Sequence, residues 1–197
     1  SIRCCAIIPT RDRADLLRTC LSSLWKTTEV SRSKGIDLDV IVMDNGSKAH
    51  ETFVLLEEWQ QKLRKSFKVI RRDEPFNWSL LNNIGAATTD ADLLLLLNND
   101  IEAIQPGWLE AMAAQASRPK IGCVGALLLY PDNSIQHAGI VVGMNGNTEH
   151  AYRHLPRMHN IHHSRSNLLT GWEAVTGACL MIRKSLLEHV GGFDEAL

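Results

Sequence analysis

Two asparagines and an aspartate follow directly after five leucines in the stretch "LLLLLNNDIE", Leu93 to Glu102. A buried polar group is costly unless it is paired, so this abrupt change predicts a strand that leaves the core where it meets water, a metal ion or a ligand. Asp100, with Asn98 or Asn99 beside it, offers the oxygen atoms that a hard divalent cation prefers. The remaining coordination positions of such a cation would go to phosphate oxygens and water.

Two other apolar runs also end in polar residues. The run "CCAIIP" leads into Thr10 and Arg11, and "LDVIVMD" ends at Asp44, followed by Asn45. Asp44 has an acceptor suited to the imide N–H of uracil or thymine. Turn formation and helix capping explain any one of these clusters, but three of them on one sheet edge favour a binding site.

Segments of strand and helix character alternate along the chain, which is typical of an α/β fold with a mostly parallel, helix-covered sheet. Such sheets bind ligands beyond the carboxyl ends of their strands. "IGCVGALLLY" reads as one strand, and "YPDNSIQHAGIVVG" reads as a turn and a strand. The polar stretch from 145 to 167 reads as a long loop.

The composition predicts one soluble domain. The chain has 197 residues, 45% of them hydrophobic, and a formal net charge of -1, so no global field favours nucleic acid. No apolar stretch reaches the ~20 residues of a membrane-spanning helix. Five cysteines without a C-x-x-C pair are typical of buried free thiols in a reducing compartment, so we expect a cytoplasmic location.

The common motifs of other enzyme classes are absent from the sequence. It contains no G-x-G-x-x-G after the first strand, no G-x-x-x-x-G-K-[ST] and no G-x-S-x-G. Hydride transfer and hydrolysis by a serine nucleophile are therefore disfavoured.

Six ordered motifs resemble those of the inverting family 2 nucleotide-sugar glycosyltransferases, in particular bacterial enzymes of O-antigen and rhamnan-type polysaccharide assembly. The motifs are "IIPTRDR", "VIVMDNGS", "EPFNWSLLNNIGAA", "LLLLLNNDIE", "YPDNSIQHAGIVVG" and "TGACLMIRKSLLEHVGGFDE". The resemblance implies a single GT-A (Rossmann-like) domain over residues 1–197. Its nucleotide-binding half would cover about 1–102, and its acceptor-binding half, a smaller mixed region, about 103–197.

The resemblance also implies roles for individual residues. Asp100 would bind the metal, Mg²⁺ or Mn²⁺, and the catalytic base is expected beyond Leu197, with Asp194 the acidic candidate inside the chain. Two further groups would bind the nucleotide sugar (Pro9, Thr10, Arg11, Asp44, Asn82, Asn98 and Asn99) and the acceptor (Thr176, Gly177 and Ala178).

The implied reaction is a single displacement at the anomeric carbon, with inversion. The donor would be a UDP- or dTDP-sugar, and the acceptor a saccharide or a lipid-linked saccharide. We expect no nucleic-acid partner. A position at the inner face of the membrane, through regions outside this sequence, is compatible with this reaction.

Two alternative functions stay open. A nucleotidyltransferase shares a similar sheet but normally begins with a glycine-rich, arginine-containing loop, which "IIPTRDR" lacks. A non-catalytic module that binds nucleoside diphosphates is the other alternative.

The histidines and two tryptophans also have more than one interpretation. His159, His162 and His163, with His150 and His154 upstream, form an incomplete zinc set, so a solvated loop is favoured. His137 and His150 match recurrent family positions and fit either a ligand contact or structural hydrogen bonding. Trp78 and Trp172 fit either stacking on a sugar or packing.

Overall fold

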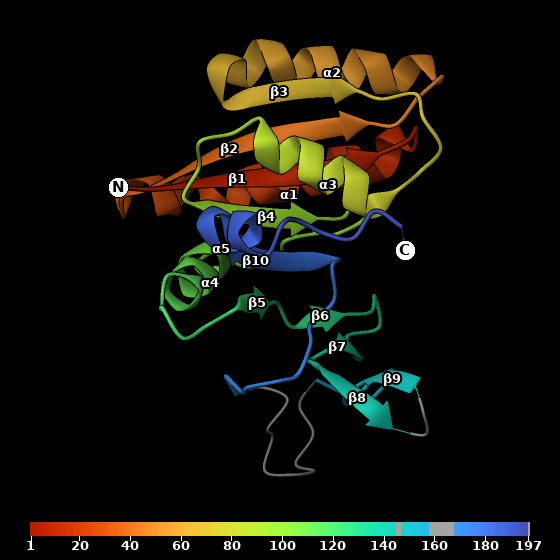
Figure 1. Ribbon diagram of the computed structural model, residues 1–197. Helices are drawn as coiled ribbons and strands as arrows, with labels where there is room; N and C mark the ends of the chain where they lie inside the picture. The colour runs from red at the N-terminus through yellow and green to blue at the C-terminus, as the bar shows by residue number, and fades with distance from the viewer. Residues whose placement is uncertain (145–146, 158–167, 197) are drawn as a thin grey trace.

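The computed structural model describes residues 1–144, 147–157 and 168–196, and its centre is a six-stranded sheet of order β3-β2-β1-β4-β10-β5 (Figure 1). The first four strands of this order are parallel, and β10 is antiparallel to both β4 and β5. The strands span Ile2–Thr10 (β1), Ile36–Asp44 (β2), Phe67–Arg71 (β3), Leu93–Leu97 (β4), Cys123–Gly125 (β5) and Cys179–Arg183 (β10). The predicted mostly parallel α/β sheet is confirmed.

Helices cover both faces of the sheet. One face packs against α1 (Ala14–Ser33), α2 (His50–Leu63) and α4 (Trp108–Ala116), and a 3-10 turn (η1, Arg64–Ser66) follows α2. The other face packs against α3 (Trp78–Ala87) and α5 (Lys184–His189), which lie toward the viewer in Figure 1. None of the helices among the described residues is both long and apolar enough to span a bilayer.

The helices on both faces of the sheet explain the leucine run of β4. Side chains of successive strand residues point to opposite faces, so Leu93, Leu95 and Leu97 pack under α1 and α4, while Leu94 and Leu96 pack under α3 and α5. A strand buried on both faces needs apolar residues at every position. All five are buried, and the chain becomes polar at Asn98, where the sheet ends.

The parallel register brings the carboxyl ends of four strands to one edge of the sheet. Thr10 at the end of β1 pairs with Asp44 at the end of β2, and Asp44 pairs with Arg71 at the end of β3. Ile7 of β1 pairs with Leu96 of β4, which places the Asn98–Asp100 turn at the same edge. We call this edge the rim.

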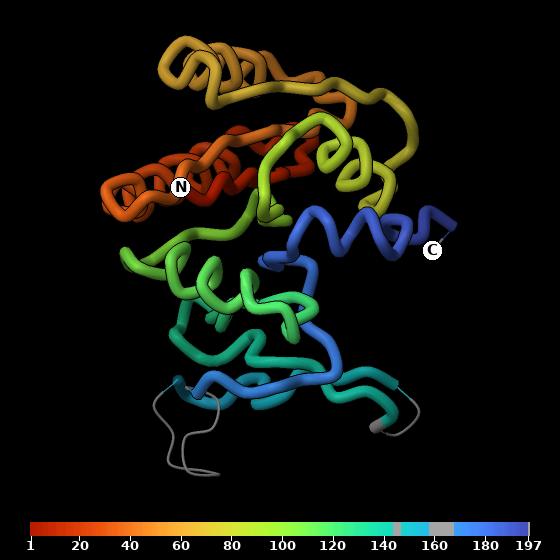
Figure 2. Tube along the Cα trace, turned by 60° about the vertical axis from the view of Figure 1, so that its left-hand side comes forward, coloured from red at the N-terminus to blue at the C-terminus, as the bar shows by residue number. Residues whose placement is uncertain are grey.

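Four short strands form a second lobe beside the sheet: β6 (Leu128–Leu129), β7 (Ile135–His137), β8 (Ile140–Met144) and β9 (Asn147–His150). The segment before β10 runs along this lobe, as Figure 2 shows, and Ile140 N donates to Ala174 O (3.0 Å). In and next to this lobe, two of the sequence predictions are wrong and a third is wrong in part. "IGCVGALLLY" splits into β5 and β6, and the strand after the turn splits into β7 and β8 at Gly139, whose φ is 138°. The predicted loop includes β9.

Candidate functional site

Hydrogen bonds at the rim join the polar ends of the strands. Asn99 Nδ2 donates to Thr10 Oγ1 (2.9 Å), and Asn45 N donates to Thr10 O (2.8 Å). Asn98 N donates to Ala178 O (2.9 Å), which connects β4 to the loop before β10. Pro9 is buried within β1, whereas Arg11 is exposed just beyond the strand. The structure therefore brings together Thr10, Asn98 and Asn99 from separate predicted clusters.

Asp44 lies at the rim, but its carboxylate is engaged by the protein. Only 2% of the residue is exposed. Oδ1 accepts from Ser47 N (3.0 Å) and Oδ2 from Arg71 Nη1 (2.9 Å). The predicted contact between Asp44 and a base imide would have to compete with these bonds.

Arg71 is a rim residue that the sequence reasoning missed. Its side chain is 43% exposed, and its Nε forms an ion pair with Asp73 Oδ1 (2.9 Å). Nη1 also donates to Ser47 O (3.2 Å), so Nε and Nη1 contact the protein and the outer edge of the guanidinium, at Nη2, is left for a ligand. Only the register of β2 with β3 reveals this pairing, because Arg71 lies 27 residues from Asp44 in the sequence.

Asp12 fixes the loop that follows β1 and was also missed. Its Oδ1 accepts from Lys48 N (2.7 Å) and Ala49 N (2.8 Å) at the start of α2, and these bonds lower the pKa of the Asp12 carboxyl. Asp12 N donates to Ser47 Oγ (2.8 Å). The ends of β1 and β2 are therefore held together by local hydrogen bonds, with Arg11 exposed between them.

Asp100 is exposed in the turn after β4, as a ligand for a shared cation requires. Within the described part of the chain, no group of three or more His, Cys, Asp or Glu side chains is arranged to hold a metal ion. The donor set at the rim therefore fits a cation that takes most of its oxygen ligands from an anionic ligand, and it does not fit a site made of protein ligands alone.

A cavity of about 440 Å³ opens beside Asn98. Its lining comes from α3, the tip of β4, the loop before β10, β10 itself and the turn after α5: Trp78, Asn98, Val175, Thr176, Gly177, Ala178, Leu180 and Phe193. All three predicted acceptor residues therefore border the same hollow as Asn98. Trp78 forms part of its wall and packs edge-on against Phe193, with ring centroids 5.1 Å apart.

Asn82 lies inside α3 packing and not on the rim. It is 0% exposed, and its Nδ2 donates to Trp78 O (2.8 Å), while Oδ1 has no hydrogen-bond partner. This burial argues against the nucleotide contact predicted for Asn82. Its neighbour Asn83 contacts the turn after α5, because Asn83 Oδ1 accepts from Phe193 N (2.9 Å) and Nδ2 donates to Glu195 Oε1 (2.8 Å).

Asp194 is exposed on that turn. Its Oδ1 accepts from Ala196 N (2.9 Å), a local bond that stabilises the turn, and Asp194 is not among the residues that line the cavity. Its role as a catalytic base stays a prediction.

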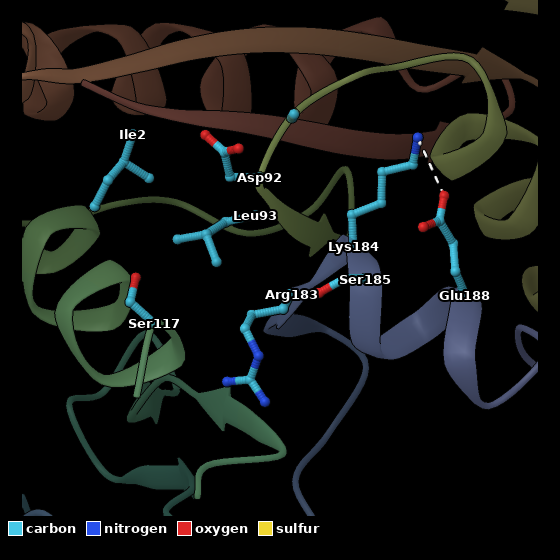
Figure 3. A pocket seen from close by; sticks show the side chains of 9 residues that line it. Ile2, Asp92, Leu93, Ser117, Arg183, Lys184, Ser185 and Glu188 are labelled. Carbon is cyan, nitrogen blue, oxygen red and sulfur yellow. Dashed lines mark ion pairs between the residues drawn. The ribbon is translucent and has the colours of Figure 1, made fainter. Parts of the chain in front are cut away.

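A second hollow of about 400 Å³ lies at the opposite edge of the sheet, near the starts of β1 and β4 (Figure 3). Lys184 and Glu188, both of α5 on one side of the hollow, form an ion pair (3.4 Å), and Lys184 Nζ also donates to Thr89 O (2.6 Å). Arg183 Nη1 donates to Ala116 O and Arg118 O at the end of α4. These charged groups already bind the protein itself, so the hollow at the rim is the better candidate site.

The structure favours packing for Trp172 and a structural role for the pair of His137 and His150. Trp172 packs against Gly139, where an added Cβ would lie 2.2 Å from the indole. His137 is buried and its Nδ1 lies 3.1 Å from Nδ1 of His150, which favours structural hydrogen bonding for the pair. His159, His162 and His163 lie outside the described residues.

Comparison with known proteins gives concordant results. The sequence matches the family model "Glycosyl transferase family 2" over residues 5–191. It is 40% identical over 191 residues to the O-antigen biosynthesis protein RfbC of Myxococcus xanthus, covering 96% of this chain and 14% of that protein. It is 39% identical over 193 residues to an uncharacterised protein of Sinorhizobium fredii, covering 96% and 20%. The chain thus spans one fifth or less of the length of these curated relatives.

Two solved structures share the fold. A mannosyltransferase from Pyrobaculum calidifontis, in complex with GDP-Man and Mn²⁺, superposes with a TM-score of 0.67 at 15% identity, covering 99% of this chain and 48% of that one. GalNAc-T7 with UDP, GalNAc and Mn²⁺ gives a TM-score of 0.74 at 16% identity, covering 100% and 38%. The similarity extends over the sheet and the second lobe.

Proposed function

Because this chain belongs to glycosyl transferase family 2 and has the GT-A fold, we propose that it transfers a sugar from a nucleoside-diphosphate donor to a saccharide acceptor, inverting the anomeric centre. One observation carries the proposal. Asn98, the first residue of the turn that carries Asp100, and the Thr176–Ala178 loop border one cavity and are joined by the bond from Asn98 N to Ala178 O. A donor diphosphate at the turn would therefore lie next to an acceptor at the loop.

The nucleotide is proposed to bind over the ends of β1, β2 and β3, within the half that covers about residues 1–102. Arg11 and the outer edge of the Arg71 guanidinium supply positive charge there, and Thr10 and Asn99 hold the strand ends together. A UDP- or dTDP-sugar is the proposed donor. The two structural neighbours carry GDP-Man and UDP, so GDP belongs in the test.

Asp100 is proposed to bind Mg²⁺ or Mn²⁺ together with the donor diphosphate. When bound, the cation supplies Lewis-acid stabilisation of the departing diphosphate, a contribution of several kcal/mol. Asp100 fits this role because it is exposed in the turn that follows a strand of buried residues. Asn98 and Asn99 keep the turn in place through their bonds to Ala178 and Thr10.

The acceptor is proposed to enter from the half that covers about residues 103–197. Thr176, Gly177 and Ala178 would contact both the acceptor and the sugar of the donor, with Trp78 as an apolar wall. A saccharide or lipid-linked saccharide in surface polysaccharide synthesis, at the inner face of the membrane, is the proposed context, consistent with the similarity to the Myxococcus xanthus O-antigen biosynthesis protein.

Calorimetry tests this proposal directly. UDP, dTDP and GDP are titrated with and without Mn²⁺, and we expect one of them to bind more tightly with Mn²⁺ present. Asp100→Asn should remove at least about tenfold of this Mn²⁺-dependent affinity, because a carboxylate ligand is lost. Glu102→Gln, at an exposed position two residues away, is the matched control and should leave the affinity unchanged.

Three outcomes separate the alternatives. Failure of all three diphosphates to bind would refute the transferase reading. Pyrophosphate release from a nucleoside triphosphate and a sugar phosphate would indicate a nucleotidyltransferase. Binding without any turnover of a sugar nucleotide, even by a longer chain that supplies the acidic residue expected beyond Leu197, would indicate the non-catalytic module.

A further inference from the structure

His137 and His150 connect the second lobe to the loop proposed to bind the acceptor. His137 lies in β7 and is 1% exposed, while His150 ends β9 and is half-buried. Their Nδ1 atoms are 3.1 Å apart, and the rings meet edge to face. The other nitrogen of His137, Nε2, accepts from Thr176 N (3.4 Å).

The main-chain bond determines where the protons lie. Thr176 N–H can only donate, so Nε2 of His137 must be the unprotonated nitrogen. In a neutral imidazole the proton is then on Nδ1, which donates to Nδ1 of His150. His150 must in turn carry its proton on Nε2. The observed contacts are therefore satisfied together only when both rings are neutral.

Protonation of His150 would break this arrangement. Nδ1 of His150 would then carry a proton that faces the proton on Nδ1 of His137, across 3.1 Å. Moving the His137 proton to Nε2 would relieve that conflict but would leave Thr176 N–H without an acceptor. Burial, and secondarily the nearby charge of His150, lower the pKa of His137 to about 4, so His137 itself does not accept the extra proton near neutral pH.

The contacts continue from the histidines to the rim. Thr176 Oγ1 accepts from Ala178 N (3.3 Å), and Ala178 O accepts from Asn98 N (2.9 Å). A continuous path of hydrogen bonds thus leads from His150 on the outer hairpin to the end of β4.

Most other titratable groups on the elements packed here are engaged elsewhere or uncharged, whereas Glu149, the residue before His150, is exposed. Glu173 Oε2 accepts from Val142 N (2.9 Å), and Arg153 Nε donates to the Tyr130 hydroxyl (2.9 Å). The remaining groups are Glu149, which is exposed in β9 opposite Val141; His154, which stacks on Tyr130; Tyr152, edge-on to Trp172; and Cys123 in β5, whose thiol pKa is raised by burial.

We propose that His137 and His150 are positioning residues that hold the Thr176–Ala178 loop against the rim, through a link that exists only while both imidazoles are neutral. The inference rests on the proposed acceptor role of that loop. In acid the Thr176–Ala178 loop, proposed to bind the acceptor, would therefore loosen, while the residues proposed to bind the nucleotide would be unaffected.

Ring tautomers measured by ¹⁵N NMR on the wild-type chain test the core of this inference. We expect His137 as the Nδ1–H tautomer and His150 as the Nε2–H tautomer at neutral pH. Neither free histidine nor a histidine ring that only packs against its neighbours requires this pair of tautomers. A His137 with its proton on Nε2 would overturn the proposal, and this measurement needs no variant and no substrate.

Hydrogen exchange of the Thr176 amide then tests the pH dependence. In the wild type, exchange after correction for intrinsic rate should become roughly fivefold faster, the effect of one lost hydrogen bond, when the sample is moved from neutral to acidic pH. His150→Gln retains an acceptor for His137 Nδ1–H and does not titrate, so protection should persist in acid. His150→Leu cannot present a proton to His137 Nδ1 and leaves Nε2 of His137 in place for Thr176 N, so exchange in this variant should also be independent of pH in this range.

His189→Gln, at an exposed position on α5, is the control and should match the wild type. If the exchange of the Thr176 amide in His150→Gln depended on pH as it does in the wild type, the proposal would be contradicted. Mn²⁺-dependent binding of the nucleoside diphosphate should be the same in all these variants. Its absence from the wild type would refute the proposed function while leaving the tautomer result intact.

Discussion

Replacing Gly177 by alanine should alter the sugar side of the candidate site and spare the nucleotide side. A Cβ at position 177 would lie 2.7 Å from Trp78 Cζ2, whereas ordinary contacts begin near 3.4 Å, so one group must move by about 0.7 Å (3.4 minus 2.7). The φ angle of Gly177 is not in the left-handed region, so alanine adds no backbone strain there and the clash with Trp78 accounts for the expected loss of stability. Overpacking of this kind typically costs ~1–3 kcal/mol.

The displacement affects the cavity wall directly, because Trp78 and Gly177 both line it next to Asn98. A misplacement near 1 Å can cost ~100-fold in productive positioning. We therefore expect the affinity for the nucleotide sugar to fall about tenfold in Gly177→Ala, while the affinity for the nucleoside diphosphate changes less than about twofold. Calorimetry with both ligands in the presence of Mn²⁺ measures the two affinities, and urea unfolding measures the stability loss.

Two further variants make the result decisive. Gly171→Ala is the matched control, since an added Cβ there meets no atom within 4 Å. Gly177→Ala combined with Trp78→Leu removes the indole that clashes and should recover part of the lost stability. Equal loss of affinity for both ligands, or a Gly177→Ala variant that behaves like Gly171→Ala, would refute the reasoning that the Trp78–Gly177 contact shapes the sugar pocket.

Two other predictions concern stability. The folded-state pKa of His137, about 4, lies below its ordinary value of 6.5, so the unfolded chain binds more protons between these values and stability should fall as pH drops from about 6.5 toward 4; thermal melts at pH 7 and pH 4.5 should show a larger loss in the wild type than in His137→Gln, and equal losses would contradict this assignment. Leu95→Ala removes a fully buried side chain from the centre of β4 and should lower the unfolding free energy by ~2–5 kcal/mol in urea titrations, whereas Leu169→Ala, at a position that is 74% exposed, should lower it by less than ~0.5 kcal/mol.

Hydropathy alone was sufficient to predict the parallel strands of the sheet. An uninterrupted apolar run such as Leu93–Leu97 requires a strand covered on both faces, and its polar end marks the edge of that cover. The same reasoning failed in the second lobe, where strands of two to five residues depend on contacts from distant segments. Gly139, for example, divides β7 from β8 because it adopts a φ of 138° against Trp172, a partner 33 residues away that no local pattern reveals.

The sequence predicted several of the side chains that lie at the rim, but it did not predict which residues they contact there. Thr10, Asn98 and Asn99 meet because parallel strands end together, and this follows from the fold class. Asp44 is different, since its burial depends on Arg71 of the neighbouring strand. Asn82 likewise turns inward because the face of α3 that packs on β1 was not fixed by the helical pattern alone.

The burial of Asp44 changes which groups at the rim could select the base of the proposed nucleotide ligand. A carboxylate with two protein partners and almost no exposed surface is already neutralised and costly to release, whereas the half-exposed Arg71 can offer its remaining N–H groups to carbonyl oxygens of a base without breaking its bond to Asp44. Asp44 then acts by holding Arg71. Arg71→Lys should therefore weaken nucleotide binding more than its retained charge suggests, because an ammonium lacks the planar fork that serves Asp44, Asp73 and a ligand at the same time.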